Sequence, residues 1–319
     1  MKINKNIFWG YMAGIITGVT YGMNPLFAMP ILKAGVQTDT VLFVRYAVAV
    51  LVLAASILIS RKSFKVSKKQ FAWLVILGLL FSNSSLGLFL AYKYIPSGVA
   101  TTIVFLYPTL VALIMVFLKV YPSWQTWVSI VLTFIAILFL CNYDSSQPIG
   151  WQGILLAFFS ALVYAVFIVI INQKRCVKII PNDILTFYSL ATGCVVFGAI
   201  ALLNSLTGKG SMIEDFALLN SHATMWINLV LLAVIPTVIS TATLAASTKI
   251  IGATKASVMG VFEPLTAILI GTLVFGEKMT WSIAVGIFLA IFAICFMILS
   301  PGKKHAQKAE KAPAANEAR

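Results

Sequence analysis

The sequence predicts an all-α integral membrane protein with ten transmembrane helices, arranged as two inverted five-helix repeats with both termini in the cytoplasm. Three observations support this fold class. The first is composition: the 319 residues are 61% hydrophobic and 10% charged, and the mean hydropathy is +0.99. Soluble domains are about one quarter charged, so this chain has too few polar side chains to cover a water-facing surface. The other two observations are the order of the apolar stretches and an internal repeat.

Ten apolar stretches follow one another along the chain, and each is long enough to cross about 30 Å of hydrocarbon. All seven tryptophans lie within a few residues of the N-terminal end of a stretch, at the interface that their amphipathic rings prefer. In chain order the predicted spans are 7–27, 39–60, 71–92, 98–118, 124–143, 151–172, 184–204, 225–247, 254–275 and 281–300.

Lysines and arginines set the direction of these spans. With the N-terminus inside, 18 basic residues fall on the cytoplasmic side, 4 fall outside, and Arg45 falls within the second span. Cytoplasmic segments of membrane proteins carry such an excess, so both termini are predicted to be cytoplasmic. Because the charges lie between apolar runs, the net charge of +14 indicates topology, and no nucleic-acid partner is expected.

The two ends of the chain have distinct compositions. Lys2 and Lys5 precede an apolar run, as in a secretory signal, but the run continues past Gly22 without a small-residue cleavage site. We therefore expect an uncleaved first span. Residues 302–319 are rich in Lys and Ala and have no apolar period. They are predicted to form a disordered cytoplasmic tail beside anionic lipid.

An internal repeat accounts for the order of the spans. Small residues recur at every fourth position in the first span (Gly10, Gly14, Gly18, Gly22) and, 143 residues later, in the sixth (Gly153, Ala157, Ala161, Ala165). Such ridges allow close helix approach. A shift of 156 aligns residues 93–114 with 249–270 and pairs Pro108 with Pro264. Five spans is an odd number, so the second copy must enter the membrane upside down, as in secondary transporters.

The segment 262–281, FEPLTAILIGTLVFGEKMTW, carries a family resemblance. It resembles the end of EamA-type members of the drug/metabolite transporter superfamily, with Glu-Pro in the ninth span and Gly-Glu before the tenth. The first repeat keeps Tyr107-Pro108 but has Val-Tyr at 120–121. The resemblance implies repeats at 1–148 and 149–301, a location in the cell inner (cytoplasmic) membrane, and efflux of small metabolites, amino acids or drugs.

Glu263 lies near the middle of the ninth span, directly before Pro264. A central acidic residue costs about 2.5–3.5 kcal/mol on insertion scales, and protonating a glutamate at pH 7 costs a similar amount. The residue is thus either a structural carboxylate or a group that couples protons or binds a substrate amine. Pro264 has no N–H, so the carbonyl of Gly260 is expected to lose its partner. Pro236 should free that of Leu232 in the same way.

Arg45 has two interpretations. It either extends outward to the membrane surface or points inward to hold a substrate carboxylate. With it, the predicted substrate-binding set is Arg45, Asn83, Asn24, Tyr21, Tyr107, Tyr188 and Glu263, and the predicted cavity-shaping residues are Pro108, Pro236 and Pro264. Further polar residues within spans are Ser82, Ser84, Ser85, Tyr164, Asn172, Thr237, Ser240, Thr241 and Thr243.

The sequence therefore predicts a secondary-active exporter of amino acids or related small metabolites, working by alternating access with possible coupling to protons. Its partners would be a small-molecule substrate, membrane lipids and, as an open possibility, a second copy in a homodimer. No cofactor, metal site or catalytic residue is predicted, because the four cysteines lack CxxC spacing and no phosphate loop is present. The alternatives are a membrane-embedded enzyme acting on lipid-linked substrates and a passive channel. Scattered acidic residues disfavour the enzyme, and the inverted repeat disfavours the channel.

Overall fold

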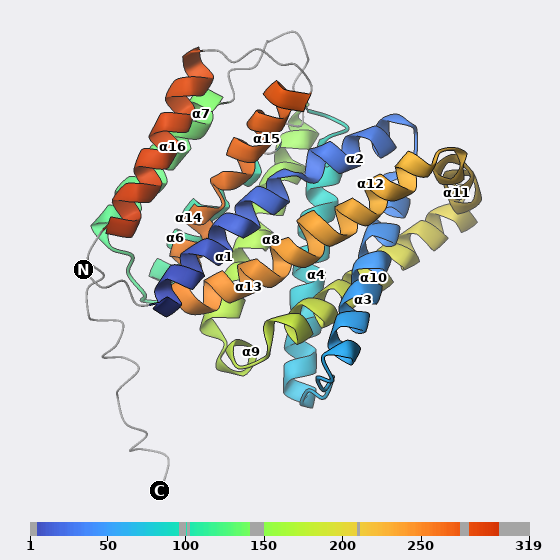
Figure 1. Ribbon diagram of the computed structural model, residues 1–319, viewed down its shortest axis with the longest axis horizontal. Helices are drawn as coiled ribbons and strands as arrows, with labels where there is room; N and C mark the ends of the chain where they lie inside the picture. The colour runs from blue at the N-terminus through green and yellow to red at the C-terminus, as the bar shows by residue number, and fades with distance from the viewer. Residues whose placement is uncertain are drawn as a thin grey trace, which may run out of the picture.

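The computed structural model describes residues 5–95, 100, 103–140, 150–208, 211–274 and 281–299. Over these ranges the chain forms α-helices and one π-helical segment, with no strand, which confirms the all-α class (Figure 1). In order, the elements are α1 (Lys5–Gly22), α2 (Asn24–Lys33), α3 (Thr38–Ile59), α4 (Lys68–Ala91), α6 (Tyr107–Phe117), α7 (Trp124–Leu140), α8 (Trp151–Gln173), α9 (Arg175–Lys178), α10 (Asn182–Leu206), α11 (Met212–Ser221), α12 (Ala223–Ala233), η1 (Val234–Ile239), α13 (Ser240–Ile251), α14 (Ala253–Met259), α15 (Phe262–Val274) and α16 (Trp281–Leu299).

Six helical stretches in the described residues are long and apolar enough to cross a membrane, so the chain is a membrane protein with several spans. They correspond to predicted spans 1, 2, 3, 6, 7 and 8. In order they are Asn6–Lys33, Thr38–Ile59, Lys68–Ala91, Trp151–Gln173, Asn182–Leu206 and Ala223–Ile251. The first is longer than predicted, because α2 continues the direction of α1 beyond a break at Met23. The remaining predicted spans contain the shorter helices α6, α7, α14, α15 and α16.

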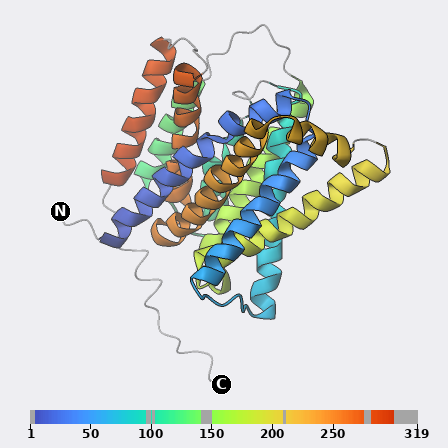
Figure 2. The same cartoon turned by 45° about the vertical axis from the view of Figure 1, so that its right-hand side comes forward.

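Helices from the two halves of the chain pack against one another throughout the fold. α1 lies against α13 and α15, α8 lies against α4 and α6, and α3 lies against α10. α7 and α16 form a separate pair at one side, visible at the left of Figure 1 and again after the rotation in Figure 2. Contacts between the two halves of the chain therefore form much of the packing among the described residues.

The glycine ridge of α1 packs directly on the second half of the chain. A methyl group added at Gly10 would lie 2.6 Å from a side-chain carbon of Ile251, and one at Gly22 would lie 2.5 Å from the backbone oxygen of Glu263. Both distances are shorter than van der Waals contact. The ridge thus allows a close helix approach, as its spacing predicts, and it places α1 beside the start of α15.

The ninth predicted span is broken near its middle. α14 ends at Met259 and α15 begins at Phe262, so the break lies just before the Glu-Pro pair. The expected loss of a partner at the Gly260 carbonyl does not occur, because the N–H of Glu263 donates to it at 2.8 Å. A tighter turn supplies this bond one residue before Pro264, where the ordinary helical donor would be missing.

The eighth predicted span accommodates Pro236 by widening into η1. The Leu232 carbonyl, which loses its ordinary donor at Pro236, accepts a hydrogen bond from the Thr237 hydroxyl at 2.8 Å. Neighbouring hydroxyl groups and local π-helical turns are the usual means by which membrane helices tolerate proline. The freed carbonyl is therefore satisfied within its own helix.

Replacing Gly260 with alanine is expected to destabilise the protein. The added methyl group would overlap the Tyr107 hydroxyl, which lies against this glycine. Overpacking of a well-packed core costs about 1–3 kcal/mol, so the apparent Tm in detergent should fall by several degrees. Tyr107→Phe removes the overlapping oxygen, and the double variant should recover part of the loss. Equal Tm values for Gly260→Ala and the unsubstituted protein would contradict this contact.

Candidate functional site

Glu263 is buried at the start of α15, with 4% of its surface exposed. The Tyr107 hydroxyl, from the start of α6, donates to its Oε1 at 3.4 Å. Tyr107 and Glu263 occupy equivalent positions in the two repeats, at the shift of 156. The breaks in the fourth and ninth predicted spans therefore bring a hydroxyl and a carboxyl group together in the core.

Three tyrosines surround this carboxyl group, and we call them the tyrosine cluster (Tyr21, Tyr107 and Tyr164). The Tyr107 and Tyr164 rings meet edge to face with centroids 4.8 Å apart. The Tyr21 and Tyr164 rings are stacked at 6.2 Å. Because Tyr21 and Tyr164 are equivalent at the shift of 143, the cluster is built from matching positions of both halves.

A small cavity lies between the tyrosine cluster and α2, with room for about one water molecule (about 20 Å³). Asn24 faces it with 3% of its surface exposed, and neither of its side-chain polar atoms has a hydrogen-bond partner among the described residues. An unsatisfied buried amide costs about 1–3 kcal/mol. The amide is therefore available to a ligand. The cavity is lined by Tyr21, Gly22, Asn24, Pro25, Leu88, Tyr92, Val104 and Glu263.

Arg45 is fully buried and points into the protein. Its Nε donates to the Thr237 hydroxyl, and its Nη2 donates to the Pro236 carbonyl at 3.4 Å. The guanidinium carbon lies 5.7 Å from the centre of the Phe89 ring. The π-helical turn at Pro236 thus holds the arginine, and the burial excludes the outward orientation.

The ionisable side chains of Arg45 and Glu263 have no ionic partner within the described parts of the chain. The ion pair found there joins Lys62 and Asp183, at the other end of α3. Glu263 and Tyr21 line the small cavity, and the Arg45 guanidinium lies against Phe89, which lines the vestibule described below. Buried charges without a counter-ion are expensive in a membrane and are typical of substrate or ion pathways.

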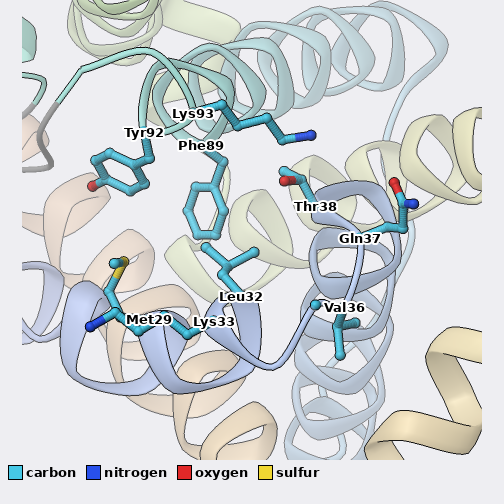
Figure 3. A pocket seen from close by; sticks show the side chains of 10 residues that line it. Met29, Leu32, Lys33, Val36, Gln37, Thr38, Phe89, Tyr92 and Lys93 are labelled. Atoms are coloured by element: carbon cyan, nitrogen blue, oxygen red, sulfur yellow. The ribbon is translucent and has the colours of Figure 1, made fainter. Parts of the chain in front are cut away.

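A larger pocket of about 420 Å³, which we call the vestibule, opens at the ends of α2 and α4. Figure 3 shows the Phe89 ring projecting into it toward Leu32, with Lys93 extended above. Phe89 also covers Arg45, and Tyr92 lines both the vestibule and the small cavity. These two aromatic residues therefore separate the vestibule from the buried charges. The vestibule is lined by Met29, Leu32, Lys33, Gly35, Val36, Gln37, Thr38, Phe89, Tyr92 and Lys93.

Two residues of the predicted set lie away from this cluster. The Asn83 amide donates to the Leu79 carbonyl of its own helix at 2.8 Å. The Tyr188 hydroxyl donates to the Phe64 carbonyl at 2.9 Å, in the loop after α3. Depth in the membrane suggested Asn83, but depth does not determine which face of a helix is turned inward. Asn83 and Tyr188 line neither the small cavity nor the vestibule, and substrate binding by them stays a prediction.

Phe89 and Tyr92 are not among the substrate-binding residues predicted from the sequence. Both lie at the end of a predicted span, where an aromatic residue is usually an interfacial anchor. Their spacing indicates that they act together, because residues three apart in a helix lie on the same face. Among the described residues no group of three His, Cys, Asp or Glu side chains is placed to hold a metal ion.

An all-helical membrane protein with two buried ionisable groups that lack an ionic partner among the described residues, one of them in a tyrosine-lined cavity, has the features of a membrane transport protein. Comparison with known proteins identifies the group within this class. Residues 8–142 and 151–299 match the EamA-like transporter family, and the chain belongs to that family. The family is described as one of transporters.

The chain is also similar to one curated protein and to one solved structure. The chain is 26% identical over 215 residues to the uncharacterized transporter YdfC of Bacillus subtilis (strain 168), covering 66% of this chain and 65% of that protein. The chain thus matches a little under two thirds of the length of this curated relative. One solved structure, described as a crystal structure of a protein, superposes with a TM-score of 0.74 at 16% identity and covers 91% of this chain and 98% of its own. At this identity the likeness establishes a shared fold.

Proposed function

We propose that the protein is a secondary-active exporter of amino acids or related small metabolites in the cell inner (cytoplasmic) membrane. Ten spans, formed by repeats at 1–148 and 149–301, would cross the membrane in opposite directions with both termini in the cytoplasm. The two repeats would rock about the tyrosine cluster, and this motion would expose the site to each side in turn. The excess of basic residues on one side supports this orientation.

Matching contacts between the halves support the inverted repeat. The Thr17 hydroxyl donates to the Ser240 carbonyl at 3.5 Å, and the Ser160 hydroxyl donates to the Ser84 carbonyl at 2.7 Å. The shifts of 143 and 156 map Thr17 onto Ser160 and Ser84 onto Ser240. The same exchange relates Gly10 packed on Ile251 to Gly153 packed on Ile95. Reciprocal contacts of this kind are expected when two copies are related by a two-fold axis in the membrane plane.

The burial of Arg45 and Glu263, without an ionic partner for either among the described residues, carries the proposed substrate class. A zwitterion would place its carboxylate against Arg45 and its ammonium against Glu263, so both buried charges would gain a partner. Asn24 would satisfy its free amide on the same ligand. The rings of Tyr21 and Tyr107 would contact the apolar part of the substrate. Glu263 would also exchange a proton for the substrate amine, which would couple export to the proton gradient.

Counterflow in proteoliposomes tests the substrate class directly. Vesicles loaded with one unlabelled amino acid should accumulate the labelled amino acid transiently. The matching carboxylate without the amine, and the matching amine without the carboxylate, should exchange at least about 10-fold more slowly, since each leaves one buried charge unpaired. Proteoliposomes without protein provide the baseline. Equal exchange of all three compounds would contradict the zwitterion site, and no exchange across a broad amino-acid panel would contradict amino-acid export.

A further inference from the structure

The two ends of the fold differ in their packing. The vestibule opens at the end that carries Lys93. At the opposite end the ammonium of Lys249 donates to the Ile180 carbonyl and to the Asn182 side-chain oxygen, the latter at 2.8 Å. Beside it the Asn172 amide donates to the Thr248 carbonyl at 3.1 Å. The structure is thus open at the Lys93 end and closed at the Lys249 end.

These open and closed ends are built from equivalent residues. The shift of 156 maps Lys93 onto Lys249, and the shift of 143 maps Gln37 onto Ile180 and Asp39 onto Asn182. The same two shifts relate the reciprocal contacts of Thr17 and Ser160 in the core. The contacts of Lys249 therefore indicate which contacts the equivalent residue Lys93 would make when the vestibule end closes.

We propose that Lys249 and Lys93 are alternating gate residues. In the state described here Lys249 closes its end on Ile180 and Asn182. When that end opens, Lys93 closes the vestibule by donating to the Gln37 carbonyl and the Asp39 carboxylate. This inference rests on the proposed alternating access, and it adds the residues that hold each end shut.

The vestibule holds Lys93 and Gln37, and Asp39 follows the last of its lining residues on α3. Gln37 and Lys93 both line it, and Figure 3 shows the Lys93 side chain extended toward Thr38, the residue before Asp39. Within the described ranges the Lys93 ammonium has no hydrogen-bond acceptor or ionic partner. Asp39 accepts from the Asn204 amide at 2.8 Å. On closure, the Asp39 carboxylate would accept from the Lys93 ammonium in place of the Asn204 amide. A carboxylate forms a stronger hydrogen bond with a cation than with a neutral donor.

The vestibule gate therefore differs from the Lys249 gate in one respect. Asp39 supplies a full negative charge where Asn182 supplies a neutral amide oxygen. The vestibule gate would be an ion pair whose lysine is exposed, so salt should weaken it. The Lys249 gate, with two neutral acceptors, should respond less to salt.

Thiol labelling measures the gates without requiring transport. In a variant with the four native cysteines replaced by alanine, Leu32→Cys places a reporter in the vestibule, and the protein in lipid nanodiscs is accessible from both sides. Lys249→Ala should favour closure of the vestibule and slow maleimide labelling by up to about 10-fold, the effect of one charge-assisted hydrogen bond. Adding Asp39→Asn should restore the rate, because the vestibule gate loses its ion pair.

Two further variants make the outcome decisive. Asn182→Ala removes one acceptor of the same gate, and it should slow labelling even if Lys249→Ala fails to fold. Lys255→Ala, a lysine of α14 outside both gates, should leave the rate unchanged. Unchanged labelling in Lys249→Ala and Asn182→Ala, or equal slowing by Lys255→Ala, would overturn the gates, whether or not counterflow succeeds. The expected labelling pattern without counterflow of any substrate would instead retain the gates and overturn the proposed function.

Discussion

Arg45→Met is expected to abolish uptake of carboxylate substrates while leaving the apparent Tm unchanged or raised. The guanidinium is fully buried without an ionic partner in the described part of the chain. Its replacement by an apolar side chain of similar length therefore removes a desolvation penalty. A substrate carboxylate would lose its partner at a cost of about 2–5 kcal/mol, which corresponds to a loss of at least about 30-fold in kcat/KM.

The measurement is initial uptake and thermal unfolding of the same purified variant. The uptake rate of Arg45→Lys should lie between those of Arg45→Met and the unsubstituted protein. A lysine keeps the charge but lacks the planar guanidinium that contacts Thr237, Pro236 and the Phe89 ring. Arg61→Ala, in the exposed turn after α3, is the control arginine and should leave both uptake and Tm unchanged. Full uptake of every carboxylate substrate by Arg45→Met would contradict the ligand role.

Glu263→Gln is expected to uncouple transport from the proton gradient. Glutamine has nearly the same shape and can still accept a hydrogen bond from the Tyr107 hydroxyl, so folding should be retained. It cannot take up or release a proton. The ratio of transport with and without a pH gradient should therefore fall to unity, and uncoupled exchange should persist at a lower rate.

The control for this prediction is Glu214→Gln. Glu214 is an exposed carboxylate on α11 and belongs to no part of the site. It should leave the response to the gradient intact. If Glu263→Gln transports normally and remains sensitive to the gradient, the carboxyl group is structural, and its role is confined to the contact with Tyr107.

Much of the helical fold follows from local features of the sequence. Apolar length and charge alone predict the membrane class and locate the six long stretches. The four-residue spacing of Gly10, Gly14, Gly18 and Gly22 predicts a close helix contact, and α1 makes it. The break at Glu263-Pro264 was also predictable, because proline cannot donate to the preceding turn. These features depend on neighbouring residues in one helix, so the sequence contains them directly.

The contents of the site depended on tertiary packing. In a chain this apolar, periodicity does not separate the inward face of a helix from the lipid face. Asn83 and Asn24 are therefore equivalent candidates in the sequence, yet only Asn24 faces the cavity. Likewise, only the folded chain joins Arg45 to Thr237, 192 residues away.

The sequence by itself determined that this chain is a helical membrane protein with a repeat, a glycine ridge and charges placed within its spans. The tertiary structure alone decided that Arg45 lies against Phe89, that Tyr92 shares a cavity with Glu263, and that Lys249 is bonded to Asn182 while Lys93 lines a pocket. The physical reason is one of range. Hydrophobicity and backbone breaks act over a few residues, whereas a buried charge is positioned by helices that are distant in the sequence and adjacent in space.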